Sequence, residues 1–248
     1  MELSTKDKKV TSVDIVIPVY NEEDCLRENI LILHNYLEGT ANFSWNIVIA
    51  NNASTDSTSK IASELSSQFD RIKHVHLPEK GRGRALRKTF SESNADIACY
   101  MDVDFSTNLK YLRLLVEGIL CGFDICIGSR LMQGSRVKRR LKRELISRIY
   151  NSIIKILFFN RFSDAQCGFK AIRTDVAKKL IPFIKNNNWF FDTELLLLAE
   201  HNKYRIFEIP VEWTEDIKTK VRIFKTVMED LLGLIRVRFS LARDRDKL

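Results

Sequence analysis

An apolar run stops abruptly at two acids in Ile97-Ala-Cys-Tyr-Met-Asp-Val-Asp-Phe-Ser106. Because side chains alternate along a strand, the carboxylates of Asp102 and Asp104 are expected on one face, at the carboxyl end of that strand. Like charges this close repel unless a positive group lies between them. A divalent ion meets that need, and a nucleotide diphosphate could supply its remaining oxygen ligands. An isolated Asp-X-Asp is more often a solvated acid pair, so the neighbouring sequence has to decide.

Apolar strands and amphipathic helices alternate around this segment. Strands are predicted at 13–19, 45–50, 72–77, 97–101 and 124–128, and helices at 25–37, from the caps at 54–57 to about 68, from about 85, and at 109–120. This alternation predicts an α/β fold with a mostly parallel sheet and helices on both faces. Ligands of such sheets collect outside the carboxyl ends of the strands. Four polar clusters fall at that edge: Asn21-Glu22, Asn51-Asn52, Lys80-Gly81 and Asp102-Asp104.

Composition sets the broad class. The chain has 248 residues, 45% of them hydrophobic, which is enough for one large domain or two small ones. We see no repeat, no signal peptide and no uninterrupted apolar stretch of about eighteen residues, so no spanning helix is expected. The five cysteines are odd in number and form no Cys-x-x-Cys. This usage indicates a reducing, cytoplasmic compartment and no zinc site.

The net charge of +8 is concentrated between residues 130 and 148. The basic residues there are Arg130, Arg136, Lys138, Arg139, Arg140, Lys142, Arg143 and Arg148, against the single acid Glu144. Such a cluster serves a nucleic acid, an anionic membrane surface or a phosphorylated ligand, or is a plain solvated face. A nucleic-acid-binding module would bind with steep salt dependence. The chain lacks an aromatic-interleaved basic platform or a recognisable binding motif, so we expect no nucleic-acid partner.

Two segments near the basic cluster and the C-terminus combine apolar and basic residues at helical spacing. They are 145–159 and 224–241. The first is compatible with an ordinary core-facing helix. Both are compatible with a helix that lies in a membrane interface, because interfacial helices join an apolar face to basic side chains.

Taken in order, the polar clusters resemble those of a family 2 inverting glycosyltransferase of the GT-A fold. The blocks that carry the resemblance are Pro18-Val-Tyr-Asn-Glu22, Asn51-Asn-Ala-Ser-Thr-Asp56, Lys80-Gly-Arg-Gly-Arg84, Asp102-Val-Asp104, Gly128-Ser-Arg130, Asp164-Ala-Gln-Cys-Gly-Phe-Lys170, Trp189-Phe-Phe-Asp-Thr-Glu-Leu195 and Glu208-Ile-Pro-Val-Glu-Trp213. Together they cover roughly residues 12–240. The last three resemble the polyprenyl-phosphate branch, the dolichyl-phosphate glucose and mannose synthases. The tryptophan-containing blocks favour the glucosyltransferase type.

The resemblance implies one GT-A catalytic domain over residues 1–248, with C-terminal amphipathic interfacial helices. Residues of about 12–130 would bind a nucleotide sugar, and about 131–240 would bind the acceptor and the membrane interface. The implied reaction moves a hexose, from UDP-glucose first and GDP-mannose second, to dolichyl or another polyprenyl phosphate, with Mg²⁺ or Mn²⁺. The protein would be peripheral on the cytoplasmic face of a membrane. A family 2 transferase with a soluble acceptor is the alternative, and it leaves the basic amphipathic stretch unexplained.

The resemblance also assigns residues. Asp102 and Asp104 would hold the metal, with Asp104 the principal ligand. The donor would contact Pro18, Tyr20, Asn21, Glu22, Asn52, Lys80 and Gly81. The acceptor phosphate would contact Arg130, Arg143 and Ser147, and Lys220 would close over a phosphate. Asp164 would act as base or orienter near the reacting centre, with a structural cap on the Cys-Gly-Phe turn as the alternative.

Two positions depart from the family's pattern. Asn51-Asn-Ala-Ser54 replaces the usual Asp-Asp-Gly-Ser, and the second Asp of that pair typically accepts a hydrogen bond from the donor's base. Asn52 can both donate and accept through its amide, so the base stays open. Lys218-Thr-Lys220 replaces Gly-Ser-Lys, keeping the hydroxyl and the lysine but losing the glycine. An inactive relative that only scaffolds membrane partners would fit Asn51-Asn52, but the intact acid pair speaks against it.

Overall fold

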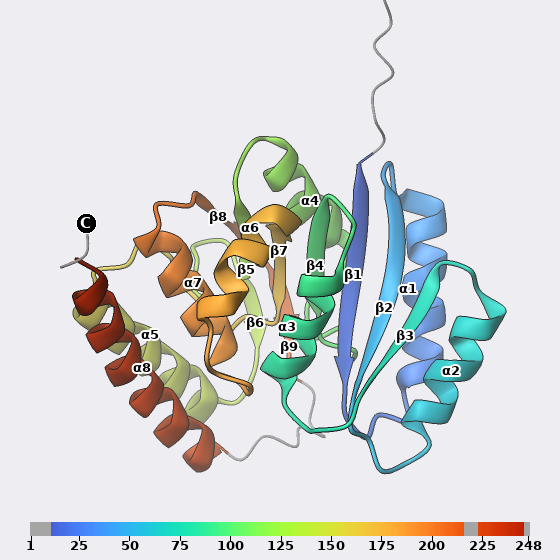
Figure 1. Ribbon diagram of the computed structural model, residues 1–248, viewed down its shortest axis with the longest axis horizontal. Coiled ribbons are helices and arrows are strands. Elements are labelled where there is room, and N and C mark those ends of the chain that lie inside the picture. The colour runs from blue at the N-terminus through green and yellow to red at the C-terminus, as the bar shows by residue number, and fades with distance from the viewer. Residues whose placement is uncertain (1–10, 216–222, 246–248) are drawn as a thin grey trace, which may run out of the picture.

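A seven-stranded sheet runs through the part of the chain that the computed structural model describes, residues 11–215 and 223–245. Its strand order is β3-β2-β1-β4-β7-β5-β8 (Figure 1). The strands are β1 Ser12–Val19, β2 Ser44–Asn52, β3 Ile72–Leu77, β4 Ile97–Met101, β5 Ile125–Ser129, β7 Phe169–Arg173 and β8 Ile206–Pro210. A separate pair consists of β6 Arg136–Lys138 and β9 Glu212–Thr214.

The sheet is mostly parallel, as the sequence predicts. β1 pairs in parallel with both β2 and β4, and β5 pairs in parallel with β8. The exception is β7, which runs antiparallel between β4 and β5. The first four strands therefore end at one edge. That edge collects the loops that follow them.

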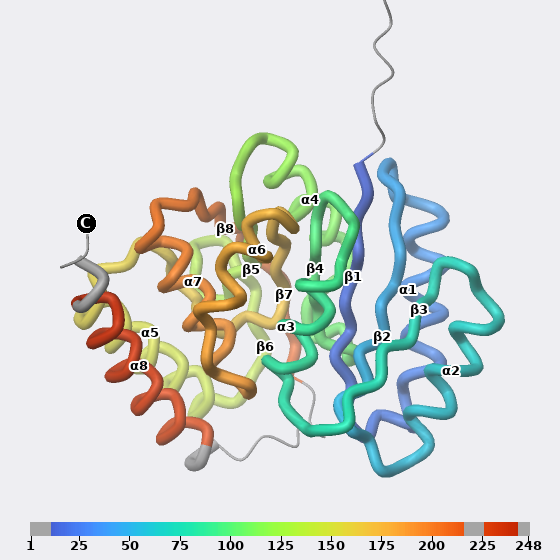
Figure 2. Tube along the Cα trace, in the orientation of Figure 1, coloured from blue at the N-terminus to red at the C-terminus, as the bar shows by residue number. Residues whose placement is uncertain are grey.

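Helices cover both faces of the sheet. They are α1 Leu26–Thr40, α2 Thr58–Gln68, α3 Arg82–Glu92, α4 Leu112–Leu120, α5 Leu141–Phe158, α6 Thr174–Leu180, α7 Phe191–His201 and α8 Ile223–Arg245, with short 3₁₀ turns at Leu109–Tyr111 and Ile181–Phe183. Side chains alternate along β1, so Ile15 and Ile17 pack with α1, α2 and α4, while Val16 packs with α3, α6 and α7. The trace in Figure 2 shows these two layers on either side of the strands.

Helices α5 and α8 lie side by side at one end of the molecule (Figure 1). Each buries one face: Tyr150 and Ile154 of α5, and Leu234 and Val237 of α8, belong to the core. Their outer faces carry exposed apolar side chains, namely Leu141, Leu145, Ile149 and Ile156 of α5, and Met228, Leu232, Ile235 and Phe239 of α8. We call these eight residues the outer apolar stripe. In the described residues, no helix has the length and apolar character needed to cross a bilayer.

The small sheet fastens the loop after β4 to the second half of the chain. Thr107 forms a β-bridge with Trp213, and the Thr214 N–H donates to the Ser106 carbonyl at 2.8 Å. β9 in turn pairs with β6, whose last residue is followed by Arg139. Two segments far apart in sequence, the acid pair and the basic cluster, are thereby brought together.

Candidate active site

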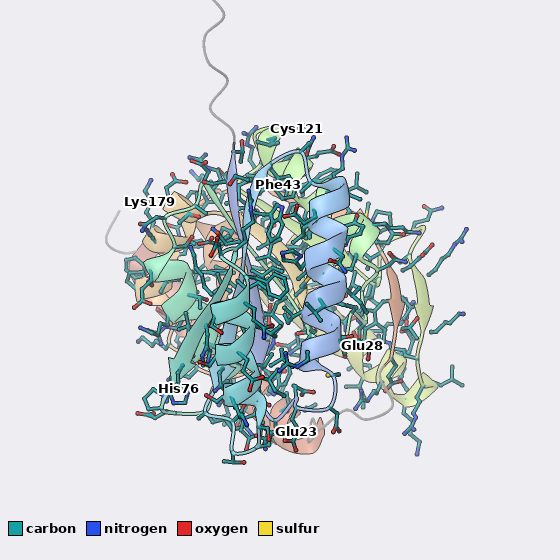
Figure 3. The ribbon with its side chains drawn as sticks, turned by 90° about the vertical axis from the view of Figure 1, so that its right-hand side faces the viewer. Glu23, Glu28, Phe43, His76, Cys121 and Lys179 are labelled. Carbon is teal, nitrogen blue, oxygen red and sulfur yellow. The ribbon has the colours of Figure 1, made fainter. Side chains whose placement is uncertain are left out.

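Backbone and side-chain bonds join the loops after β1 and β2. The Asn21 N–H donates to Ser54 Oγ at 3.0 Å, and the Asn21 carboxamide oxygen accepts from the Thr55 N–H at 2.8 Å. The Glu22 N–H donates to Thr58 Oγ1 at 2.8 Å. In Figure 3 Glu23, which follows these residues, and His76 of β3 lie at the same end of the molecule, opposite Phe43. The predicted gathering at one edge is confirmed for these loops.

The side chains of the two asparagines at the end of β2 both form hydrogen bonds within the protein. Asn51 is fully buried: its oxygen accepts from the Ser54 N–H at 3.1 Å, and its amide nitrogen lies 3.2 Å from His76 Nδ1. The Asn52 oxygen accepts from the Gly81 N–H at 2.6 Å. Asn52 can offer a ligand its NH₂ group as a donor and the second lone pair of its oxygen as an acceptor.

The start of α3 closes this side of the edge. Lys80 Nζ lies 3.4 Å from the centroid of the Tyr20 ring, a cation–π contact. A Cβ on Gly81 would fall 2.5 Å from the Asn187 carbonyl oxygen. A Cβ on Gly83 would fall 2.7 Å from the Cβ of Phe191. Both glycines thus allow α3 to begin against the 186–191 loop, and the helix starts three residues before the predicted Ala85.

The acid pair lies beyond β4, which ends at Met101. The prediction that strand alternation directs both carboxylates is therefore wrong, since the chain has left the strand before Asp102. Asp104 accepts from the N–H and the hydroxyl of Ser106, at 2.9 and 2.8 Å. The turn is completed by Phe105 at φ 50°. Asp102 lies against Gly168, where a Cβ would fall 2.1 Å from its Oδ2.

A buried arginine connects the acid pair to the interior. Arg82, whose side chain is 8% exposed, donates to Asp102 at 3.0 Å and to Asp192 at 2.6 Å. Asp192 also accepts from Lys170 Nζ at 2.7 Å. The two carboxylates hold the pKa of Arg82 above its ordinary value in spite of burial. The guanidinium of Arg82 thus supplies, at Asp102, part of the positive charge that we expect near the two acids.

The carboxylates fit a divalent ion. Asp102 and Asp104 present oxygen donors, which hard cations such as Mg²⁺ and Mn²⁺ accept. Among the described residues, no group of three or more His, Cys, Asp or Glu side chains gathers that could enclose an ion by itself. An ion held here would therefore complete its ligands with oxygens of a bound diphosphate or with water.

The residues predicted to lie on the acceptor side include one ion pair. Arg130 donates to Asp164 three times: from its backbone N–H at 3.0 Å, from Nε at 2.7 Å and from Nη2 at 2.9 Å. Asp164 is 0% exposed. Arg130 lowers the pKa of Asp164 to about 2 against the opposing effect of burial. A carboxylate so fully occupied has little capacity to accept a proton, and its evident effect is to fix the direction of Arg130.

Arg143 and Ser147 lie on the first turns of α5. Arg143 Nη1 pairs with Glu215 at 2.8 Å, at the end of β9 and two residues beyond Trp213. Ser147 lies one turn further along α5, where its carbonyl accepts from Asn151. The structure thus anchors Arg143 near the small sheet. Of the other predicted residues, Pro18 lies in β1 opposite Ala50 of β2, and Lys220 lies outside the described residues.

Comparison with known proteins identifies the family. The model of "Glycosyl transferase family 2" matches residues 14–181, more than half of the chain. The chain belongs to this family. The observed sheet and its helices are those of the GT-A fold, so the resemblance found in the sequence is confirmed.

Two relatives by sequence and one solved structure show what this transferase is similar to. The glycosyltransferase AglD of Haloferax volcanii is 34% identical over 228 residues, which are 90% of this chain but only 35% of that protein. The human dolichyl-phosphate beta-glucosyltransferase is 28% identical over 251 residues, covering 94% of this chain and 77% of the relative. Glucosyl-3-phosphoglycerate synthase of Mycobacterium tuberculosis, solved with Mn²⁺, UDP-glucose and phosphoglyceric acid, superposes with a TM-score of 0.68 at 15% identity, over 93% and 80% of the two chains. That likeness shows a shared fold.

Several residues of the transferase's site escaped the sequence analysis. Lys170, buried beside Asp192, and Trp213 belong to the family-like motifs but carry no predicted role of their own. Arg82 lay between two glycines without an assigned role. No local signal marks these residues, because each acquires its role from a partner distant in the chain: Arg82 and Asp192 are 110 positions apart.

Helix α8 is tied to the interior of the transferase by charge. Arg236 makes two bonds to Glu194, at 2.8 and 2.9 Å, and Glu194 also accepts from the Asn186 N–H at 2.9 Å. On the same helix Asp230, 3% exposed, accepts from Gln166 Nε2 at 2.6 Å. Burial raises the pKa of Asp230 to about 7, with smaller contributions from Glu229 and Asp192, while the bond from Gln166 lowers it.

The raised pKa of Asp230 makes stability depend on pH. A carboxyl whose pKa is about 7 in the fold and 3.8 when unfolded stabilises the fold fully below about pH 4 and loses this contribution as pH rises to about 7. We expect the free energy of unfolding of the wild type to fall relative to that of Asp230→Asn across this window, by on the order of 4 kcal/mol at most. Urea unfolding at a series of pH values measures it. Parallel profiles for the two proteins would contradict the prediction, and Asp70→Asn, which alters an exposed acid, is the control.

Proposed function

We propose that this transferase moves a hexose from a nucleotide sugar to dolichyl or another polyprenyl phosphate, with inversion at the anomeric carbon. The single observation that carries the proposal is the place of the buried Arg130–Asp164 pair. Arg130 lies 5.5 Å from the centre of the Trp213 ring, and Trp213 is bridged to Thr107, close to the acid pair. The Ala165 N–H, next to Asp164, donates to Asn151 of α5, and the outer face of that helix carries half of the outer apolar stripe. A phosphate joined to a long apolar chain has this same order of charge and hydrocarbon. The dolichyl-phosphate glucosyltransferases among the relatives support the choice.

The acceptor needs little proton transfer. The second pKa of a phosphate monoester is near 6, so at neutral pH an oxyanion is already present. Its oxygen attacks the anomeric carbon, a new carbon–oxygen bond forms, and the bond from that carbon to the diphosphate oxygen breaks as the nucleoside diphosphate leaves. Positioning and charge compensation are what the protein must supply. We assign Asp164 the role of orienting Arg130 rather than that of a base.

On the donor side, we propose that residues of about 12–130 bind the nucleotide sugar, with Tyr20 and Asn52 facing the nucleoside. UDP-glucose is the favoured donor and GDP-mannose the second. The Asn52 NH₂ would donate to a carbonyl oxygen of the base. Uracil and guanine both carry such an oxygen, so the donor panel has to choose between them.

Mg²⁺ or Mn²⁺ is the proposed cofactor, held by Asp104 with Asp102. Bound there with the diphosphate, a divalent ion offsets the negative charge that develops on the departing nucleoside diphosphate. Asp102 keeps its place through Arg82 and through the absence of a side chain on Gly168.

We propose peripheral association with the cytoplasmic face of a membrane. A polyprenyl chain remains in the bilayer, so the catalytic domain must reach it there. The outer apolar stripe lies beside exposed basic residues of the same helices, such as Lys142 and Arg148 on α5 and Arg238 on α8. Apolar side chains bordered by basic ones are suited to an anionic lipid surface.

A donor panel tests the function. Purified protein is incubated with labelled nucleotide sugars and dolichyl phosphate in detergent, with Mg²⁺ or Mn²⁺. We expect label in the organic phase, with UDP-glucose the best donor, and an anomeric configuration in the product opposite to that of the donor. If no donor gives an organic-extractable product, the proposal is wrong. A labelled water-soluble product, with the lipid phosphate inert, would establish the soluble-acceptor alternative.

A further inference from the structure

Arg139 has a buried guanidinium with an unused end. Its side chain is 5% exposed, and its Nε donates to Glu144 at 2.6 Å. Its Nη2 is buried and has no hydrogen-bond partner among the described residues. Glu144 also accepts from Arg148, so its charge is shared between two arginines. A buried charged donor without a partner is costly, which indicates that a ligand completes this position.

A second arginine, Arg130, whose side chain is 11% exposed, lies next to it. The guanidinium carbons of Arg130 and Arg139 lie 5.5 and 5.9 Å from the centre of the Trp213 ring. Burial and the nearby charge of Arg130 lower the pKa of Arg139. The oxygens of Asp164 are occupied by Arg130 and by the Gln166 N–H, so that carboxylate has little left to offer Arg139. Two like charges are thus held together around one aromatic ring.

The position of this pair relates it to the reaction. Trp213 is bridged to Thr107, three residues after Asp104, so the arginines lie across the small sheet from the acid pair. Arg139 lies two residues before Leu141, the first residue of α5 and of the outer apolar stripe. A ligand held by both guanidiniums would place its charged end toward the acid pair and would have an apolar path along α5.

We propose that Arg139, together with Arg130, forms the subsite for the phosphate monoester of the acceptor, with Arg139 Nη2 donating to a phosphate oxygen. This proposal rests on the proposed function and adds a residue that neither the resemblance nor the relatives assign. Arg139 Nη2 is a charged donor that Glu144 does not use, and the planar forks of arginine suit the oxygens of a phosphate.

The test separates binding from turnover. Arg139→Gln is compared with Arg140→Gln, which removes the same charge from the adjacent, exposed arginine. Binding of a short-chain prenyl phosphate is measured by calorimetry without any nucleotide sugar, and Michaelis constants are measured in detergent micelles. We expect Arg139→Gln to weaken binding and to raise the Michaelis constant for the lipid phosphate by about 10- to 100-fold, as for a lost hydrogen bond to a charged group. The Michaelis constant for the donor and the thermal midpoint should stay close to those of the wild type.

Each other outcome has a definite meaning. If the wild type does not bind the prenyl phosphate, the proposed function itself is wrong. If the wild type binds it and Arg139→Gln binds equally well, the subsite is wrong while the function stands. A rise in the Michaelis constant for the donor alone would place Arg139 on the diphosphate and overturn the proposal. Should Arg139→Gln fold poorly, Arg139→Lys keeps the charge without Nη2, and unchanged lipid-phosphate affinity in that variant would equally overturn it.

Discussion

Asp104→Asn is expected to reduce turnover by a factor on the order of 10³ or more. The substitution removes a negatively charged ligand of the proposed ion, and the neutral amide of asparagine cannot replace that charge. The side chain is exposed, and an asparagine oxygen can still accept from the Ser106 N–H, so the fold should be retained. Initial rates with labelled donor and dolichyl phosphate, measured as Mg²⁺ or Mn²⁺ is raised to saturation, give the result.

Asp70→Asn is the matched control for Asp104→Asn. It makes the same change of charge at an exposed acid between α2 and β3, and its rates should equal those of the wild type. Near-wild-type turnover of Asp104→Asn at saturating metal would remove Asp104 from the metal site. A loss of turnover that is accompanied by a lower thermal midpoint would instead show a structural role.

Asp164→Asn should lower the free energy of unfolding by about 3–5 kcal/mol, because Arg130 is left buried without its counter-ion. It should also abolish most activity, since an amide cannot accept from both Nε and Nη2 of the guanidinium. The pH dependence follows from the lowered pKa: with about 2 in the fold and 3.8 when unfolded, Asp164 stabilises the fold above about pH 4, and this contribution is lost as pH falls toward 2. Urea unfolding at neutral and acid pH measures both effects.

The double variant Asp164→Asn with Arg130→Gln separates stability from function. Without the buried charge, much of the stability lost in Asp164→Asn should return, because neutral partners leave no unpaired ion. Activity should stay low, because the guanidinium is gone. An Asp164→Asn protein with wild-type unfolding free energy would show that the pair contributes little. A double variant with wild-type turnover would remove Arg130 from the acceptor site.

Local sequence was sufficient for the first half of the fold. The strands 72–77 and 97–101 are where the sequence predicts them. The second is a continuous apolar run ended by polar residues, as a buried strand of a parallel sheet requires. The antiparallel insertion of β7 was not predictable in this way. Phe169–Arg173 lies between two strands that are far from it in sequence, and its direction depends on packing rather than on its own residues.

The site was predictable where it consists of strand-end loops, and not where it depends on distant pairs. The gathering of Asn21 and Asn52 follows from topology alone. From the sequence we expect Gly81 and Gly83 near the donor. In the structure both glycines pack against a loop about a hundred residues away, and a side chain at either position would collide with it. Arg139 had no distinguishing mark within a run of basic residues, and only burial sets it apart from Arg140.

The bond from Arg82 to Asp102 bears on the entropy of ligand binding. Because the guanidinium holds Asp102 and Asp192 together from inside the protein, the position of Asp102 is fixed as part of folding. The conformational freedom of this acid is therefore given up once, when the chain folds, and not again each time a substrate arrives. Affinity for the proposed nucleotide sugar and ion would then reflect the contacts that they form with an acid whose position is already fixed.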